Sequence, residues 1–198
     1  MGTTDVARLA GETARANILI AATEQFAEHG FRRTSLAAVA RAAGLSQAGL
    51  LHHFPSKKRL LAAVLGSRDV EDLQLLAPGL EQAGGDLMTV LDLLPEVVRA
   101  NSRRMTVVRL AHVCALESDA SDWARKRRQA VRNIFESAAR RSAELGTARD
   151  DIDPAQVASL IIATFEGLEN QWLLDPDFDM VAPMQAMVDM LRRDLTST

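Results

Sequence analysis

The sequence has no tyrosine, few aromatic residues of any kind and one cysteine. Aromatic side chains make up 4% of the 198 residues, whereas alanine, leucine and arginine, which favour helices, are abundant. Because β-branched and aromatic residues favour strands, this composition predicts an all-α protein. The single cysteine, Cys114, excludes an internal disulfide and a cysteine-based zinc finger, which fits a reducing compartment. We interpret Cys114 as a small buried apolar residue in preference to a redox switch.

The sequence also lacks a long apolar run. No stretch reaches the roughly 18 consecutive apolar residues that a transmembrane helix needs, and Met1–Ala10 has neither the basic start nor the apolar centre of a signal peptide. With 47% hydrophobic and 25% charged residues, the chain has the composition of a folded globular protein. We therefore expect a cytoplasmic protein with no membrane partner.

Taken alone, the net charge of -3 argues against a nucleic-acid partner, but the charges are unevenly distributed along the chain. Residues 1–60 hold eight basic and four acidic side chains, a net charge of +4, whereas residues 61–198 hold 15 basic and 22 acidic side chains, a net charge of -7. A polyanion is therefore expected to bind the N-terminal region. The acidic remainder favours neutral or cationic small molecules.

Apolar residues recur at helical spacing along the chain, and glycine and proline residues mark the ends of the helical segments. In the N-terminal region the expected helices cover residues 12–29, a segment from Thr34 or Ser35 to Gly44, residues 46–53 and residues 56–76. In the remainder they cover about 86–100, 103–117, 122–145, 154–174 and 181–195, with a kink or a division at Pro95.

Residues 34–54 have the spacing of a helix-turn-helix motif. The small Ala40 allows the two helices to cross closely, and Gly44 can adopt the positive φ that the turn requires. A miniature core is expected from Val39, Leu45, Leu50 and Phe54. The second helix then leaves small and hydrogen-bonding residues outward, where they can meet base edges in the major groove: Gln47, Ala48, Leu51, His52 and His53.

These motifs resemble the TetR family of bacterial transcriptional regulators. The resemblance runs from residue 12 to about residue 64 and rests on Phe-x-x-x-Gly-Phe from Phe26, Thr-Ser from Thr34, Val-Ala-x-x-Ala-Gly-Leu-Ser from Val39 and Gly-Leu-x-x-His-Phe-x-Ser-Lys from Gly49. Residues 165–176 are similar to the penultimate helix of many members. The resemblance implies an all-helical homodimer with a DNA-binding head and a larger body that binds a small-molecule inducer and dimerises through its last two helices. Leu51 departs from the pattern, because members often carry a tyrosine there that contacts the DNA backbone.

Three cations follow Ser56, where the next helix begins: Lys57, Lys58 and Arg59. Cations in the first turn oppose the helix macrodipole, and no glutamate at position 59 completes a capping box with Ser56. Such an arrangement is understandable if DNA phosphates neutralise the charges. The predicted DNA-contacting residues are Arg33, Thr34, Ser35, Ser46, Gln47, Ala48, Gly49, Leu51, His52, His53, Lys57 and Lys58.

The rest of the chain supplies candidates for an effector pocket and a dimer interface. Large, polar and adaptable side chains together line mostly apolar cavities, and the candidates for ligand binding are Met105, Arg109, His112, Trp123, Phe135, Phe165 and Glu169. The last two helices carry more apolar residues than one buried side can hold, which predicts a four-helix dimer seam. The candidates for that seam are Leu160, Thr164, Leu168, Gln171, Trp172, Met184, Met187, Val188 and Leu191.

The sequence therefore predicts three regions: a disordered tail over residues 1–10, a helix-turn-helix DNA-binding domain over residues 11–65, and a helical ligand-binding and dimerisation domain over residues 66–198. The predicted function is transcription regulation by a repressor that a small-molecule effector releases from a palindromic double-stranded DNA operator. The alternative is an all-helical small-molecule carrier or enzyme in which the helix-turn-helix is only a packing motif. No catalytic motif, phosphate loop or metal-ligand spacing occurs, so we expect no enzymatic activity, no metal and no cofactor.

Overall fold

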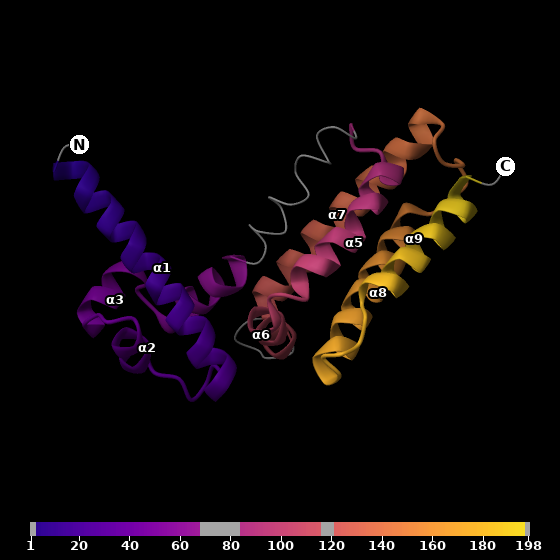
Figure 1. Ribbon diagram of the computed structural model, residues 1–198. Coiled ribbons are helices and arrows are strands. Elements are labelled where there is room, and N and C mark those ends of the chain that lie inside the picture. The colour runs from indigo at the N-terminus through magenta and orange to yellow at the C-terminus, as the bar shows by residue number, and fades with distance from the viewer. Residues whose placement is uncertain (1–2, 68–83, 116–120, 197–198) are drawn as a thin grey trace. The chain divides into compact units, whose positions relative to one another are not determined.

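The protein is all-α, as its composition predicts. The computed structural model describes residues 3–67, 84–115 and 121–196, and these ranges hold helices and turns but no strand (Figure 1). The helices are α1 (Thr3–His29), α2 (Leu36–Ala42), α3 (Gln47–His53), an unlabelled helix over residues 57–67, α5 (Leu87–Asn101), α6 (Met105–Ala115), α7 (Ser121–Leu145), α8 (Pro154–Leu174) and α9 (Val181–Thr196).

Most helix boundaries follow local signals in the sequence. The carboxylates of Asp86 and Asp153 accept hydrogen bonds from backbone N–H groups in the first turns of α5 and α8, so both helices begin with side-chain caps. α5 continues through the buried Pro95 and is not divided there. The expected helix ends at Leu76 and Glu117 lie outside the described residues.

The N-terminus corrects one expectation. α1 begins at Thr3, whereas the sequence analysis placed a disordered tail over residues 1–10 and the helix start at about Glu12. Asp5 lies in the first turn, where a negative charge is favourable, and Arg8 pairs with Glu12 four residues later at 3.3 Å. These local interactions extend the helix over residues 3–10.

The chain divides into two compact units. The head comprises residues 1–68 and 109–124, and the body comprises residues 69–108 and 125–198. In the head, α1 contributes Ile18 and Phe26, and the helix over residues 57–67 contributes Leu60 and Val64, all fully or almost fully buried. Residues 109–124 complete the same core with the buried side chains of Leu110, Ala111 and Cys114. The expected DNA-binding domain ended at residue 65 and did not include this segment.

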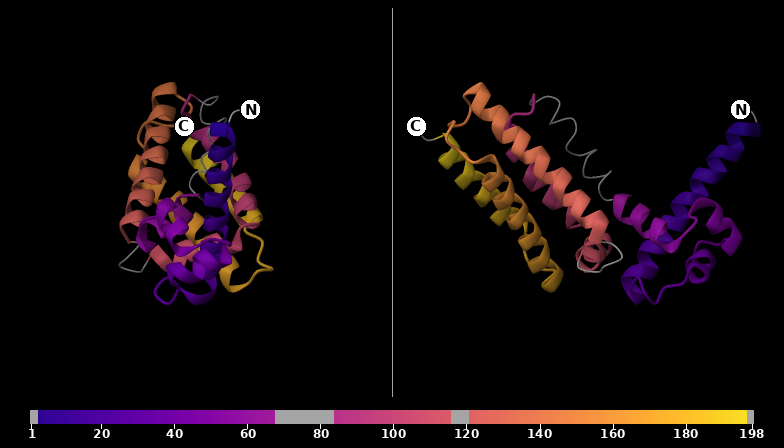
Figure 2. Two further views of the ribbon diagram at one scale, coloured as in Figure 1. Left: turned by 90° about the vertical axis from the view of Figure 1, so that its left-hand side faces the viewer. Right: turned by 180° about the vertical axis from the view of Figure 1, so that it is seen from behind.

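The body is built from long helices that lie lengthwise against one another (Figure 2). α9 packs against both α5 and α8, and its buried Met184 and Val188 share one core with Leu91 of α5 and Ile161 of α8. At the start of α5 the buried hydroxyl of Ser142 on α7 accepts a hydrogen bond from the backbone N–H of Leu87 at 2.8 Å. The body thus has its own apolar core, separate from that of the head.

Candidate nucleic-acid interface

The helix-turn-helix is formed by α2 and α3, and each of them begins with a serine cap. Ser35 Oγ accepts a hydrogen bond from the backbone N–H of Ala38, and Ser46 Oγ accepts one from Gly49, both at 3.1 Å. Of the two caps that the sequence allowed for α2, Ser35 is therefore the one used. Gly44 has a φ of 71°, and the backbone N–H of Leu45 donates to the carbonyl of Ala40 at 2.8 Å, which closes the turn as predicted.

The inner side of the motif forms the small core that the sequence predicts. Val39 and Leu50 are fully buried, Phe54 is almost fully buried, and Leu45 packs against them. The inward side of α3 is thereby fixed on the head. Its outer side carries the exposed side chains of Gln47, Ala48, Leu51 and His52, while Gly49 and His53 are half-buried.

Thr34 occupies a different position from the one expected. Thr34 is 4% exposed, and its hydroxyl lies 2.9 Å from each of two carbonyl oxygens of the head, those of Gln25 and Gly30, to which it can donate a hydrogen bond. A hydroxyl engaged in this way holds the turn between α1 and α2. The sequence pattern could not separate Thr34 from Ser35, because both residues are good caps at the start of a helix.

Lys57 is also engaged inside the head. Its ammonium group donates hydrogen bonds to the carbonyl of Arg32 at 3.1 Å and to that of Thr34 at 2.9 Å, and it lies 4.6 Å from the centroid of the Phe31 ring. The sequence analysis interpreted Lys57 as a phosphate contact. The structure shows that its charge satisfies carbonyl groups of the turn that leads into α2.

Other cations near the motif are exposed. Arg33 is exposed and its Nε donates to the carbonyl of His29 at 3.0 Å, while Lys58 and Arg59 are exposed in the first turn of the following helix. Ser56 Oγ accepts a hydrogen bond from the backbone N–H of Arg59 at 3.2 Å, so this helix has a serine cap even without a glutamate at position 59. The cations around α3 therefore differ in role, and Lys58 has the exposure that a phosphate contact needs.

Arg15 is a basic residue beside the motif that no sequence pattern indicates. Its guanidinium group lies 5.1 Å from the centroid of the Phe54 ring, which places a basic side chain of α1 beside the C-terminal end of α3. The two residues are far apart in the sequence, and neither belongs to a short motif that links them. Only the packing of α1 across the motif brings them together.

The predicted ligand-binding residues are divided between the two units. Met105, Phe135, Phe165 and Glu169 belong to the body, where Phe135 is buried and Met105 and Phe165 pack against the core. Arg109, His112 and Trp123 belong to the head, where Arg109 is exposed and Trp123 packs against the head core. The candidates therefore form two groups, one in each unit, and only Phe135 of those named is a buried apolar core residue.

Glu169 is the member of that set with the most unusual surroundings. Glu169 is 2% exposed, and its carboxylate Oε1 accepts a hydrogen bond from Asn101 Nδ2 at 2.7 Å. Arg104 in turn donates to Asn101 Oδ1. A buried carboxylate requires such hydrogen-bond donors. Asn101, Arg104 and Glu169 therefore form a hydrogen-bonded polar cluster within the body.

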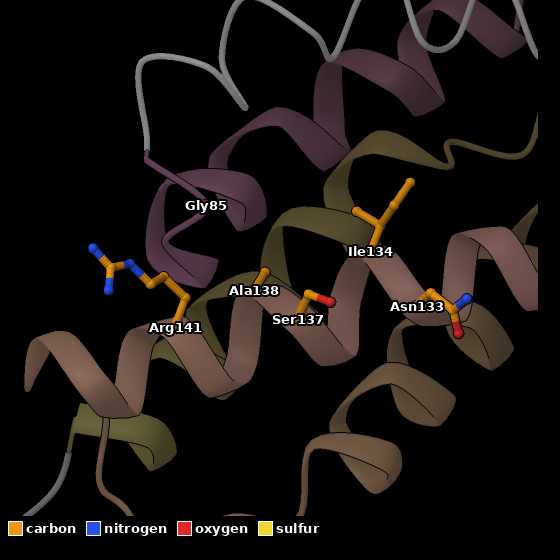
Figure 3. A pocket seen from close by; sticks show the side chains of 6 residues that line it. All are labelled: Gly85, Asn133, Ile134, Ser137, Ala138 and Arg141. Carbon is orange, nitrogen blue, oxygen red and sulfur yellow. The ribbon is translucent and has the colours of Figure 1, made fainter.

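The body also has an open surface hollow of about 500 Å³ (Figure 3). None of the predicted ligand-binding residues lines it. Most of its wall comes from one face of α7, and its lining residues are Gly85, Asn133, Ile134, Ser137, Ala138 and Arg141. This hollow is therefore a different feature from the pocket that the sequence predicts.

Five of the nine predicted interface residues are buried within the chain's own body. α8 and α9 pack against neighbours inside the body, and many of their apolar residues belong to its core. The five are Leu168, Trp172, Met184, Met187 and Val188. Leu160, 57% exposed, and Gln171 are exposed, whereas Thr164 and Leu191 are half-buried. Leu174 and Met190, which are not among the nine predicted residues, are 82% and 55% exposed.

Within residues 3–67, 84–115 and 121–196, no three His, Cys, Asp or Glu side chains gather as metal ligands do. In the same ranges no helix combines the length and the apolar character that crossing a bilayer requires.

Comparison with known proteins agrees with this geometry. Residues 18–64 match the family described as bacterial regulatory proteins, tetR family, and residues 88–197 match the family described as BetI-type transcriptional repressor, C-terminal. The second match alone spans more than half of the chain. The chain belongs to the TetR family, and it is a DNA-binding transcriptional regulator. An enzyme or carrier with an incidental helix-turn-helix is not favoured.

Similar proteins come from several bacteria. The chain is 29% identical over 185 residues to the HTH-type transcriptional regulator TtgR of Pseudomonas putida, and 88% of each chain is covered. The crystal structure of NalD, the secondary repressor of the MexAB-OprM multidrug efflux pump in Pseudomonas aeruginosa, is 25% identical with a TM-score of 0.73, covering 93% of this chain and 98% of that one. A complex of SmeT with triclosan shares the fold with a TM-score of 0.78 at 23% identity, covering 89% and 88% of the two chains.

Proposed function

We propose that this regulator is a repressor that binds a palindromic DNA operator as a homodimer and releases it when a small-molecule effector binds the body. The observation that carries the proposal is the outer side of α3, which exposes Gln47, Ala48, Leu51 and His52 on a helix anchored by buried Leu50. A helix of this kind can enter the major groove and meet base edges. NalD, which is similar over nearly the whole chain, is a repressor.

The DNA-binding surface centres on α3 and includes nearby cations. In this proposal Gln47 pairs with a base edge, and Arg33 and Lys58 contact phosphates. Ser35, Ser46, Gly49 and His53 lie at the margins of the same surface. Thr34 and Lys57 act from inside the head, because their polar groups are engaged with backbone carbonyls.

The dimer forms through α8 and α9. Exposed or half-buried Leu160, Thr164, Gly167, Gln171 and Leu174 recur on α8 at alternating steps of four and three residues, which is the spacing of a helix-packing stripe. A side chain placed at Gly167 would meet no atom within 4 Å in the single chain, so the middle of the stripe is open to a close neighbour. A second copy of the chain would cover this stripe, with Met190 of α9 beside it.

The effector site lies at the polar cluster of the body. Glu169 and Asn101 present a hydrogen-bonding pair inside an apolar core, and a ligand that competes for these donors and acceptors would repack α5 against α8. Release of DNA requires that the effector bind the two conformations of the body with different affinity.

A binding titration tests the proposed function. Fluorescently labelled duplexes from the region upstream of the regulator's own gene are titrated with the full-length protein, in the presence and absence of excess unrelated DNA. We expect one duplex to bind at nanomolar protein with a footprint related by a two-fold axis. If excess unrelated DNA abolishes binding to every duplex, the proposal of a specific operator is wrong. A library of small molecules is then scored for release of the operator, and transcription in vitro distinguishes a repressor from an activator.

A further inference from the structure

Leu51 is a large apolar side chain left in water on the reading face of α3. It is 37% exposed, although the residue before it, Leu50, is fully buried. Leu51 follows Gln47 by four residues and Ala48 by three, and residues at these spacings are neighbours on a helix surface. The exposed leucine therefore belongs to the same surface as the two side chains nearest the start of α3.

The chemistry of leucine limits what this side chain can contact. It carries neither a hydrogen-bond donor nor an acceptor, so it cannot pair with the polar groups of a base edge or bond to a phosphate oxygen. The tyrosine that many family members carry at this position can make such a phosphate contact through its hydroxyl. In the major groove, the apolar group that distinguishes one base from the others is the C5-methyl group of thymine.

We propose that Leu51 is a specificity-determining residue that packs against the C5-methyl group of a thymine in each half of the operator. Burying an exposed leucine against a methyl group removes apolar surface of both partners from water, which favours a thymine at that position. One helical turn separates Leu51 from Gln47, about 6 Å along the axis. The thymine therefore lies within about two base pairs of the base that Gln47 contacts. This inference rests on the DNA-binding function and adds a base preference to it.

The experiment removes single methyl groups from the DNA. An operator is first selected from random duplexes with the full-length wild-type protein, and each thymine is then replaced in turn by deoxyuridine, which lacks only the C5-methyl group. We expect one position in each half to weaken wild-type binding by about fourfold, the effect of one buried methyl group. The other replacements should leave the dissociation constant nearly unchanged.

Variants of the protein assign the methyl contact to a residue. In Leu51→Ala the thymine and deoxyuridine operators should bind equally at the sensitive position, whereas Leu51→Met should retain most of the difference. Gln47→Ala, as the matched control on the same face, should weaken binding and still discriminate thymine from deoxyuridine. Because Leu51 is exposed, Leu51→Ala should keep the thermal unfolding midpoint of the wild type.

The results that overturn the inference are distinct from those that overturn the function. If the wild type binds a selected operator and no thymine is sensitive to loss of its methyl group, Leu51 does not contact such a group. If a sensitive position persists unchanged in Leu51→Ala, another residue makes the contact. If no sequence is enriched from random DNA, the operator-binding function itself fails.

Discussion

Lys57 Nζ donates a hydrogen bond to the carbonyl oxygen of Thr34 at 2.9 Å, and this contact joins the first turn of the helix over residues 57–67 to the residue that precedes the α2 cap. The same ammonium donates to the carbonyl of Arg32 at 3.1 Å. The charge of Lys57, for which the sequence predicts a phosphate contact, thus stabilises the turn between α1 and α2. The position of the Ser35 cap depends on that turn.

We expect Lys57→Met to lower the stability of the protein by about 1–2 kcal/mol. The change keeps most of the aliphatic side chain and removes two charge-assisted hydrogen bonds, which are only partly screened by water at this half-buried position. The midpoint of thermal unfolding should fall by about 2–8 °C. The salt dependence of DNA binding, measured on folded protein, should keep the slope of the wild type.

Lys58→Met is the matched control for this prediction. Lys58 is exposed, and removal of a phosphate contact there should lower the slope of log K against log salt by about 1. The opposite pattern, a lower slope for Lys57→Met with unchanged stability, would restore the sequence-based interpretation of Lys57 as a phosphate contact.

Gln47→Ala should weaken binding to the operator by about 1–3 kcal/mol and leave non-specific DNA unaffected. The amide of an exposed glutamine on the reading helix can pair with an adenine edge, and this interaction depends on the base sequence. Anisotropy titrations against the operator and a scrambled duplex at one salt concentration measure both affinities. Equal losses on the two duplexes would mean that Gln47 does not distinguish bases.

Asn101→Ala should destabilise the body by about 1–3 kcal/mol, because it removes the amide that donates to the buried carboxylate of Glu169. Urea unfolding followed by circular dichroism gives the free energy. Asn170→Ala, at an exposed position of α8, serves as the control and should change stability by no more than about 0.5 kcal/mol. A stability loss that is the same in both variants would show that the Asn101–Glu169 hydrogen bond contributes nothing specific.

Leu160→Glu should convert the proposed dimer to a monomer at micromolar concentration, since it places a charge in the proposed α8 stripe. Ile20→Glu is the control, because Ile20 is 60% exposed on α1 and Leu160 is 57% exposed on α8. Sedimentation velocity of the two variants and the wild type measures the assembly. A wild type that sediments only as a monomer at this concentration would contradict the homodimer.

The sequence predicts well those features that depend on neighbours in the chain. Ser46 and Asp153 are side-chain caps in the structure, and Gly44 has the positive φ that the turn requires. Features that depend on distant partners are not indicated by the local sequence. The carbonyl acceptors of Lys57 lie 23 and 25 residues earlier, and nothing in the local pattern of Lys57 indicates them.

The α8 and α9 residues show the same limit. Helical spacing identifies apolar faces, but it does not state which face a neighbouring helix of the same chain covers. Trp172 and Met184 are buried in the body core, whereas Leu174, only two residues after Trp172, is exposed. Deciding between core and interface needs the packing of α9 against α5 and α8, which no short motif encodes.

The completion of the head core by residues 109–124 has a consequence for biosynthesis. Leu110, Ala111 and Cys114 emerge from the ribosome only after residues 69–108 of the body have been made. At bacterial rates of elongation, translation of residues 69–114 takes about 2–10 seconds. During that interval the nascent helix-turn-helix is present without its full apolar support, so the DNA-reading unit matures later than its place at the N-terminus suggests.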